Sequence, residues 1–460
     1  MDSSRRKFLQ KLSASTALLA TNGHLTEAEI EHRIMLVDKK ITANDKVRIG
    51  LIGAGIIGNI DTECALKVPG IELGGVCDLY QGRLDRAKEK WGTDLFTTKN
   101  YQELLNRKDI DAVLICTSDH WHDHISIAAM NAGKHVYCEK PMVHHIDEGQ
   151  AVIDTQKRTG KVFQVGSQRA SALSILEAKK VFEQGIIGDL TFVEASNDRS
   201  SANGAWQYTL PTDASTKTID WDNYLGDAPK VAFDPLRFFR WRNYKDYGTG
   251  VAGDLFVHLL TGLHTITSSK GPKSIYAMGD LTYWKDGRDA YDLVNGVMEY
   301  PKTEQHPAFQ FVTRVNLASG TGGSQATRLI GTEGVIELGW SNFKVKHFKR
   351  PIAPEFGGYD SVDSYPKAMQ EELQKQYDAK FPTDTRIWKN EKEISFESPA
   401  NYDDRFDHFI SFFEGIRAKG VIREDATFGL RAAGPSIACN MSAAKHQIIK
   451  WNPETMKVVV

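Results

Sequence analysis

The sequence predicts an α/β protein in which a doubly wound parallel sheet is followed by an α+β domain with an open, mostly antiparallel sheet. Three observations support this prediction. The chain has 460 residues, more than one hydrophobic core usually serves. Short apolar runs alternate with helical patterns from 46 to 165, as in a parallel sheet with crossover helices. Beyond residue 166, strand-like runs follow one another directly, which favours antiparallel pairing.

The first strand leads into a glycine-rich turn. Val47 to Ile52 is a short run rich in β-branched residues, which predicts a buried strand. The turn after it matches the pattern G-x-G-x-x-G with Gly53, Gly55, Ile56, Ile57 and Gly58. In this pattern the glycines permit a tight turn, a close approach to a pyrophosphate and close helix packing, and the helix N-terminus offers free N–H donors. The turn predicts a dinucleotide site in a Rossmann domain, although an ordinary βα turn is the alternative.

A second strand, Ile71 to Cys77, ends at Asp78, about 20 residues beyond the turn, where this fold places an acidic residue. A carboxylate there accepts hydrogen bonds from ribose hydroxyls and repels a phosphate. The expected cofactor is therefore NAD, and Arg83 leaves NADP as the less favoured alternative.

The remaining elements complete this outline. Further strands are expected at 112–117, 134–138 and 162–165, with helices at 124–132 and 147–159. After a helix at 174–184, we expect strands at 190–196, 274–283, 294–300, 309–317, 327–331 and 335–338, and helices at 403–418 and 426–447. Residues 198–248 are rich in Trp, Tyr, Asn and Arg and lack periodicity, which is typical of a functional loop. We therefore divide the chain into 1–45, a Rossmann domain at 46–165, and a substrate domain at 166–460.

Residues 1–45 carry an export pattern. Arg5 and Arg6 precede a modest apolar stretch, Leu12 to Ala20, as in twin-arginine signals, which predicts a periplasmic or secreted protein. The alternative is the basic tail of a cytoplasmic protein, because no clear cleavage site follows. An exported protein has no free nicotinamide pool around it, so the cofactor should be tightly held and regenerated in place. No apolar run is long enough to predict a membrane span.

Composition narrows the classes of partner. The formal net charge of −2, with no basic cluster beyond the N-terminus, argues against nucleic acid and favours a small molecule. The five cysteines form no C-x-x-C pair and are expected to be buried apolar residues, not disulfides or metal ligands.

Polar residues follow two strands of the predicted Rossmann domain, at the edge where ligands bind in such sheets. Expected cofactor contacts are Thr117, Ser118, His122, Glu139, Lys140 and, after the last strand, Gln168. Lys140 stands between Glu139 and Pro141. Facing a nicotinamide, its pKa would be depressed by desolvation and by the positive ring, which suits proton transfer. A solvated lysine is the alternative.

These residues resemble the Gfo/Idh/MocA family of oxidoreductases. The resemblance rests on the glycine turn with Asp78, the turn at 117–122 and above all AGKHVYCEKP at 132–141, and it covers about nine-tenths of the chain. It implies a Rossmann domain, an open sheet whose outer face forms a homo-oligomer (dimer or tetramer), and an active site between them. It also implies that Lys140, with Glu139 beside it, contacts both cofactor and substrate.

A second family signature is Asp-x-x-x-His, found here as Asp254 and His258. On a helix both side chains project from one face, one turn apart. An acid that stabilises the helix dipole beside a capped histidine is the alternative. With the E-K-P motif, we predict His258 as the base, Lys140 as stabiliser of the developing alkoxide, and Asp254 as the group that orients His258 or grips a hydroxyl. Two departures are Ser118, where relatives carry proline, and GTGVAG before Asp254 in place of a glycine triplet.

Substrate contacts are expected from Arg169, Trp206, Arg240, Trp241, Arg242 and Tyr247. Planar rings and bidentate donors suit the apolar faces and hydroxyls of a carbohydrate or cyclic polyol. A hydrophobic lid with arginines at its rim is the alternative. His120, His122 and His124 invite a metal site, but the segment turns from a strand into a helix and lacks carboxylate ligands, so no metal is predicted.

The sequence thus predicts an NAD-dependent oxidoreductase that acts on a ring hydroxyl of a sugar, glycoside or cyclic polyol. A nearby alternative is an NAD-dependent glycosidase that works by transient oxidation and elimination. Lys140 counts against it, because sequences similar to that branch lack the E-K-P lysine. A non-catalytic NAD or sugar sensor is the third interpretation.

Overall fold

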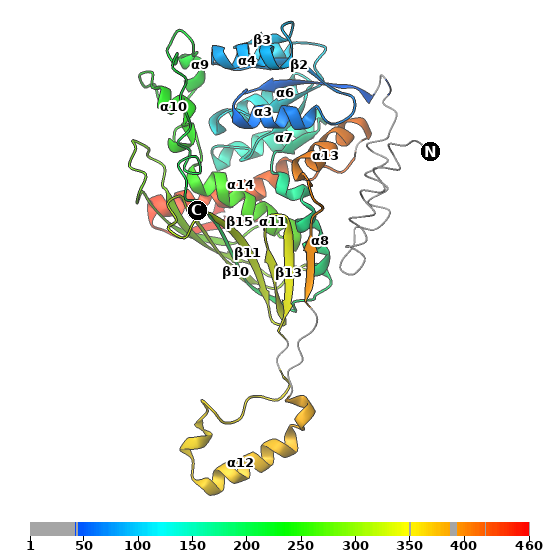
Figure 1. Cartoon of the computed structure of the whole chain (residues 1–460), viewed down its shortest axis with the longest axis vertical. Coiled ribbons are helices and arrows are strands. Elements are labelled where there is room, and N and C mark those ends of the chain that lie inside the picture. The colour runs from blue at the N-terminus through cyan, green and yellow to red at the C-terminus, as the bar shows by residue number, and fades with distance from the viewer. Residues whose placement is uncertain (1–41, 43–44, 349–350, 387–392, 419, 460) are drawn as a thin grey trace.

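The computed structural model of the chain describes residue 42 and residues 45–459, except 349–350, 387–392 and 419 (Figure 1). The predicted export signal therefore lies outside the described residues. Among the helices that are described, none combines the length and the apolar character that crossing a bilayer requires.

The first domain is built on a six-stranded parallel sheet. Its strands run in the order β3-β2-β1-β4-β5-β6, which is the Rossmann order. They are β1 (Val47–Ile52), β2 (Ile71–Cys77), β3 (Phe96–Thr98), β4 (Ala112–Ile115), β5 (His135–Cys138) and β6 (Phe163–Val165). The helices are α3 (Ile56–Ala65), α4 (Gln81–Trp91), α5 (Tyr101–Leu105), α6 (His122–Asn131) and α7 (Gly149–Thr159). The predicted doubly wound sheet is confirmed, and the three-residue β3 was too short to be predicted.

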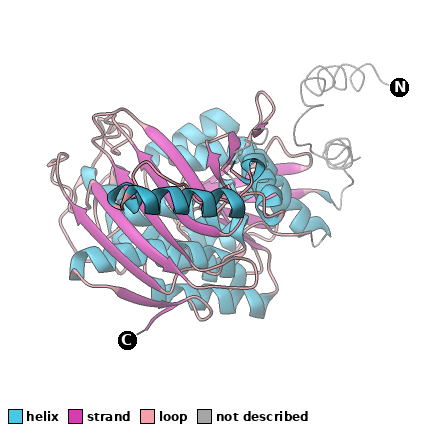
Figure 2. Cartoon of the chain, turned by 90° about the horizontal axis from the view of Figure 1, so that it is seen from below, coloured by secondary structure: helices cyan, strands magenta, loops and turns pink. Residues whose placement is uncertain are grey.

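The second domain contains a ten-stranded sheet with the order β14-β13-β12-β11-β7-β10-β9-β8-β15-β16. Only β7 and β10 pair in parallel, so the prediction of a mostly antiparallel sheet is confirmed. The strands are β7 (Leu190–Asp198), β8 (Ser274–Asp280), β9 (Leu293–Tyr300), β10 (Phe309–Asn316), β11 (Ser324–Gly331), β12 (Gly334–Leu338), β13 (Asn342–His347), β14 (Ile394–Glu397), β15 (Ile449–Asn452) and β16 (Lys457–Val459). They lie side by side in Figure 2.

Helices α8 (Leu173–Glu183), α11 (Val257–Thr267) and α14 (Ala426–Lys445) pack between this sheet and the Rossmann domain (Figure 1). Short helices α9 (Trp221–Leu225) and α10 (Pro235–Phe239) lie in the aromatic loop, beside the Rossmann domain. Helix α12 (Lys367–Lys380) belongs to an arm that projects from the end of β13 and β14, and none of its residues is buried.

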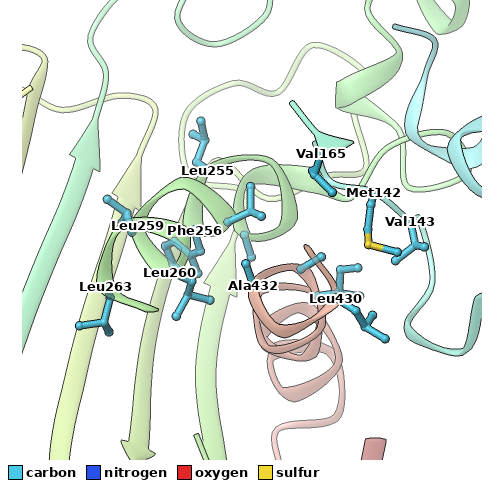
Figure 3. Close-up of a cluster of buried hydrophobic side chains, with 14 of the residues drawn as sticks. Met142, Val143, Val165, Leu255, Phe256, Leu259, Leu260, Leu263, Leu430 and Ala432 are labelled. Atoms are coloured by element: carbon cyan, nitrogen blue, oxygen red, sulfur yellow. The ribbon is translucent and has the colours of Figure 1, made fainter. Parts of the chain in front are cut away.

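The two domains share one hydrophobic core (Figure 3). Met142 follows the E-K-P motif and packs, with Val165 of β6, against α14. At Gly429 of α14 an added Cβ would lie 2.6 Å from Val165 Cγ2 and 2.8 Å from Met142 Sδ. Because this contact leaves no room for a side chain, the segment that carries Lys140 is fixed against the helices of the second domain.

The predicted boundary at residue 165 needs one correction. Helix α13 (Asp404–Ala418), assigned from the sequence to the second domain, packs against the Rossmann sheet. Its Phe409, Phe412 and Phe413 are fully buried, and the Phe409 ring stacks on Tyr137 of β5 with 4.5 Å between centroids. This packing joins residues far apart in the sequence, which a periodicity pattern cannot reveal.

All five cysteines are buried and free, as predicted. Burial raises the pKa of the Cys77, Cys116 and Cys439 thiols. They behave as small apolar core residues.

Phe409→Ala removes a buried ring from the core of the first domain. We expect the free energy of unfolding to fall by about 3–5 kcal/mol, with faster hydrogen exchange in β1 and β5. Chemical unfolding and hydrogen exchange measure both effects. Val421→Ala, at a side chain that is 81% exposed, is the control and should change stability by less than about 0.5 kcal/mol. Unchanged exchange in β1 and β5 would contradict the place of α13 in this domain.

Candidate functional site

A cavity of about 710 Å³ lies between the Rossmann domain and the second sheet. The size suits a small-molecule site. The predicted site residues that line it are Gly53, Gly55, Ile56, Ile57, Asp78, Thr117, Ser118, Glu139, Lys140, Gln168, Arg169, Trp206, Trp241, Arg242, Asp254 and His258. Gly58, His122, Arg240 and Tyr247 do not line it. The structure thus brings most of the predicted cofactor, catalytic and substrate residues into one space.

The glycine turn forms one end of this cavity. Gly53 has a φ of +93°, and an added Cβ would lie 2.5 Å from the Cys116 carbonyl oxygen. At Gly58 a Cβ would lie 2.1 Å from the Gly53 carbonyl oxygen, so this glycine serves the packing of helix against strand. The first turn of α3 has no acidic residue and no side-chain cap, which leaves its N–H groups free for an anion. These features fit the pyrophosphate of a dinucleotide.

Asp78 is fixed at the end of β2. Its carboxylate accepts hydrogen bonds from the backbone N–H groups of Ala54 (2.8 Å) and Tyr80 (2.9 Å). The Arg83 guanidinium lies 3.3 Å from the same carboxylate and packs over the Phe238 and Phe239 rings. A carboxylate held at the cavity edge fits a ribose diol, and the positive charge of Arg83 is partly balanced by it.

Lys140, Asp254 and Arg242 form a buried ionic cluster. Lys140 Nζ lies 2.9 Å from Asp254 Oδ1 and also donates to the Asp254 main-chain oxygen at 3.1 Å. Arg242 Nε donates to the same Oδ1 at 3.0 Å. Burial favours the neutral acid, but the Lys140 ammonium and the Arg242 guanidinium prevail and hold the pKa of Asp254 well below its usual range. The carboxylate therefore stays charged and fixes the position of the lysine amine.

His258 lines the cavity and is partly buried. Burial, followed by the nearby Lys140 ammonium, lowers the pKa of His258 well below its usual value. Its Nδ1 is buried and has no hydrogen-bond partner among the described residues. Among the described residues, Asp254 makes no hydrogen bond to His258. Its carboxylate binds Lys140 and Arg242 instead, so in this structure it holds the lysine amine and does not orient the histidine. A neutral imidazole beside a cationic amine can accept a proton from a bound alcohol.

Asp254 lies in a π-helical turn, Ala252–Phe256, that leads into α11. Such turns often occur at functional sites. Gly250 has a φ of +60°, and a Cβ at Gly253 would lie 2.1 Å from Thr249 Cβ. The sequence GTGVAG thus keeps glycine where the turn requires it. Asp119 ties this turn to the Rossmann domain, because it accepts hydrogen bonds from the Thr249 N–H and hydroxyl at 2.9 and 2.8 Å.

The three histidines after β4 have separate roles. His122, predicted as a cofactor contact, is buried beside the cavity, with Nδ1 2.7 Å from the Pro141 carbonyl oxygen and Nε2 3.2 Å from that of Thr117. Its ring supports the backbone of the E-K-P segment and does not line the cavity. His120 Nε2 contacts the Tyr224 carbonyl oxygen, and His124 is exposed. A different cluster, His144, His145 and Glu148, has metal-ligand spacing, but Glu148 accepts from both histidine backbone N–H groups as part of a helix cap.

Two predicted substrate residues also stand outside the cavity. Tyr247 is fully buried in an aromatic cluster with Tyr224, and Arg240 Nε donates to the Tyr208 carbonyl oxygen at 2.8 Å. Both side chains therefore stabilise the aromatic loop. The sequence pattern could not show this, because the loop core consists of aromatic rings without a regular spacing. Trp206 is buried with a φ of +64°, and the Arg242 guanidinium stacks on Trp241 at 4.2 Å.

Gln168 and Arg169, which follow β6, are both held by hydrogen bonds to neighbouring residues. Gln168 Nε2 donates to Glu139 Oε1 at 3.1 Å. Arg169 donates to the Trp340 carbonyl oxygen at 2.6 Å and lies 3.6 Å from Asp404. Other cavity residues that the sequence did not indicate are Arg199, Tyr208, Trp340, Asp404 and Arg405. None of them belongs to a recognisable sequence motif, and only the folded structure brings them together at the cavity.

The aromatic loop also contacts the Rossmann domain. The Asp220 N–H donates to the Leu79 carbonyl oxygen at 3.0 Å, and the Gln81 N–H donates to that of Thr218 at 2.9 Å. The Tyr80 hydroxyl donates to Asp213. The loop thus closes the end of the cavity next to Asp78.

Comparisons with known proteins agree with this geometry. Residues 47–167 match the model of the oxidoreductase family with an NAD-binding Rossmann fold, Gfo/Idh/MocA. An inositol 2-dehydrogenase of Salmonella typhimurium is 31% identical over 157 residues, which cover 34% of this chain and 47% of the relative. A glycosyl hydrolase family 109 protein of Shewanella baltica is 32% identical over 214 residues, covering 42% and 45%. The matches span about half the length of these curated relatives.

Solved structures share the fold over a longer stretch. A levoglucosan dehydrogenase in complex with NADH and levoglucosan has a TM-score of 0.61 at 19% identity, and the match covers 88% of this chain and 99% of that one. A putative myo-inositol dehydrogenase of Sinorhizobium meliloti has a TM-score of 0.58 at 18% identity, with the same coverage. The likeness therefore includes the second domain.

Asp254→Asn keeps the side-chain shape and removes the charge that Lys140 and Arg242 share. We expect the free energy of unfolding at pH 7 to fall by about 3–5 kcal/mol, because the buried Lys140 and the partly buried Arg242 lose their anion. Folding lowers the pKa of Asp254, so its contribution is complete above the unfolded-state pKa of about 4 and is lost as the pH falls below it. Urea unfolding should show the gap between wild type and variant narrowing from pH 7 to pH 3.

A matched control is Asp246→Asn, which breaks a half-exposed ion pair with Arg237. This change should cost less than about 1 kcal/mol. A gap for Asp254→Asn that stays constant with pH would contradict the lowered pKa.

Proposed function

We propose that the chain is an NAD-dependent oxidoreductase of the Gfo/Idh/MocA family, whose model matches residues 47–167, and that it acts on a ring hydroxyl of a sugar, glycoside or cyclic polyol. One observation carries the proposal. The Lys140 amine, held by Asp254, and the neutral imidazole of His258 line the same cavity as the glycine turn. That combination is what oxidation of an alcohol by a nicotinamide requires.

The preference for NAD over NADP is part of the proposal. It is supported by the buried Asp78 carboxylate, which suits a ribose diol and repels a 2′-phosphate. The charge of Arg83 is shared with Asp78 and the two phenylalanine rings, which reduces its value as a phosphate ligand. NADH bound to the levoglucosan dehydrogenase is consistent with this choice.

In the proposed mechanism, the substrate hydroxyl lies between Lys140 and His258. Lys140 donates a hydrogen bond to the hydroxyl oxygen and stabilises the negative charge that develops there, while Asp254 keeps the amine in place. His258 takes the hydroxyl proton, which its neutral state permits. The bound nicotinamide supplies the hydride acceptor. In the reverse direction His258 returns the proton to the carbonyl oxygen.

We further propose that the cofactor is retained through many turnovers in the periplasm. The aromatic loop supports this, because its contacts with Leu79, Tyr80 and Gln81 cover the end of the cavity next to Asp78. The twin-arginine pattern at Arg5 and Arg6 supports the location. Regeneration would then occur in place, by oxidising one carbohydrate and reducing another.

A homo-oligomer, dimer or tetramer, is also proposed. The face of the second sheet opposite the helices exposes apolar side chains, including Tyr276 and Met278 of β8 and Val297 of β9. Exposed apolar patches of this kind mark interaction surfaces.

An NAD-dependent glycosidase is the second candidate, favoured by the similarity to the glycosyl hydrolase family 109 protein. Lys140 argues against it. Release of nitrophenol from nitrophenyl glycosides would separate the two functions, because an oxidoreductase leaves the glycosidic bond intact.

Lys140→Ala and His258→Ala test the mechanism. The variants and wild type are loaded with NAD, mixed with a panel of glycosides and polyols, and followed at the absorbance band of reduced nicotinamide. We expect each variant still to bind NAD and to lose about 10²–10⁴-fold in the rate of single-turnover reduction. The control is Lys245→Ala, which changes an exposed lysine of the aromatic loop and should retain the full rate of reduction. A rate unchanged in both active-site variants would contradict the proposal, as would failure of the wild type to bind NAD.

Tyr80→Ala tests cofactor retention. It removes a ring from the aromatic cluster and the hydrogen bond to Asp213, so the loop loses its hold on the Rossmann domain. We expect NADH to dissociate about tenfold faster or more, measured by its fluorescence after rapid dilution. Tyr80→Phe keeps the ring and should show a smaller change. Equal dissociation rates in all three proteins would show that the loop does not retain the cofactor.

A further inference from the structure

Two tryptophan–arginine pairs flank the catalytic residues. The Arg242 guanidinium, which binds Asp254, stacks on Trp241 at 4.2 Å. On the other side, the Arg169 guanidinium stacks on Trp340 at 4.7 Å. Both tryptophans line the large cavity. The Arg242–Trp241 pair is explained by the bond of Arg242 to Asp254, whereas the Arg169–Trp340 pair has no part in the proposed mechanism.

Trp340 is held firmly but its ring is not buried. It lies in the turn between β12 and β13, and its carbonyl oxygen accepts hydrogen bonds from Arg169 Nη1 at 2.6 Å and Ser174 Oγ at 3.2 Å. Arg169 is 5% exposed, and its charge is met by Asp404 at 3.6 Å. The Trp340 ring nevertheless remains 56% exposed. An exposed aromatic ring that lines a cavity can offer one face to a ligand.

This platform lies next to the catalytic histidine. A separate small cavity is lined by both Arg169 and His258, together with Leu338 and Gly339, the two residues that precede Trp340. Asp404 and Arg405 line the same large cavity as Trp340. Asp404 lies 3.6 Å from Arg169, and Arg405 Nε lies 2.9 Å from Asp61 Oδ1. The site thus continues past the position of the reacting hydroxyl onto an aromatic surface with charged groups at its rim.

We propose that Trp340 is the stacking platform for a second pyranose ring, so that the preferred substrates are disaccharides or longer glycosides. This inference rests on the proposed function. A pyranose presents an apolar face of C–H groups and a rim of hydroxyls. The apolar face can stack on the open face of the indole. The hydroxyls can form hydrogen bonds with the carboxylate of Asp404 and the guanidinium of Arg405. A monosaccharide would fill the space at His258 and leave Trp340 uncovered.

The test compares matched pairs of ligands. Methyl glucosides and methyl galactosides, and the methyl disaccharides that extend each by one pyranose, are bound to the NAD-loaded enzyme and followed by calorimetry and by nicotinamide reduction. For wild type, at least one disaccharide should bind about 10–30-fold more tightly than its monosaccharide. Trp340→Ala should abolish that difference and leave monosaccharide binding and NAD binding unchanged. Trp340→Phe, which keeps a smaller ring, should retain part of it.

The outcomes separate this inference from the proposed function. If monosaccharides and disaccharides bind equally to wild type, or if Trp340→Ala weakens both alike, the second-ring platform is wrong, whether or not turnover occurs. If a disaccharide preference depends on Trp340 but no sugar reduces the nicotinamide, the platform stands and the proposed oxidoreductase activity fails. The backbone bonds of Trp340 are the same in all three proteins, and equal NAD affinity verifies that each variant is folded.

Discussion

The structure of the site depends on one carboxylate shared between two cations. Asp254 comes from the turn before α11, Lys140 from the end of β5, and Arg242 from the aromatic loop. Three segments, far apart in the sequence, therefore meet at one buried oxygen. Because each charge is costly to bury alone and favourable only when the others are in place, the cluster forms as a unit. It keeps the lysine amine in position, and the Lys140 ammonium adds to burial in lowering the pKa of His258.

The common core makes this meeting point rigid. Met142, two residues after Lys140, packs with Val165 against Gly429 of α14, and α14 also packs against α11 beyond Asp254. The two domains thus cannot separate at Lys140 and Asp254 without opening packed apolar surface. Access of ligands is left to the periphery of the cavity, where the aromatic loop joins the Rossmann domain through a small aromatic cluster around Tyr80 and a few hydrogen bonds.

The sequence predicted the parts of the molecule that are encoded locally. The glycine turn, Asp78, Lys140 and the Asp254–His258 pair each stand in a short motif whose spacing carries its own physical reason. His122, Tyr247 and Arg240 were placed in the site because of their type, yet the structure uses them to support backbone and loop. Trp340 and Phe409 could not be predicted, because their roles arise from contacts across more than a hundred residues of chain.

The buried thiols have a consequence for where the chain can work. Each cysteine lies inside packed structure, and burial disfavours the thiolate at Cys77, Cys116 and Cys439. Thiolate is the species that attacks disulfides and is oxidised first. The folded chain thus exposes no thiol to an oxidant or a disulfide exchange partner, so its cysteines do not restrict the chain to a reducing compartment.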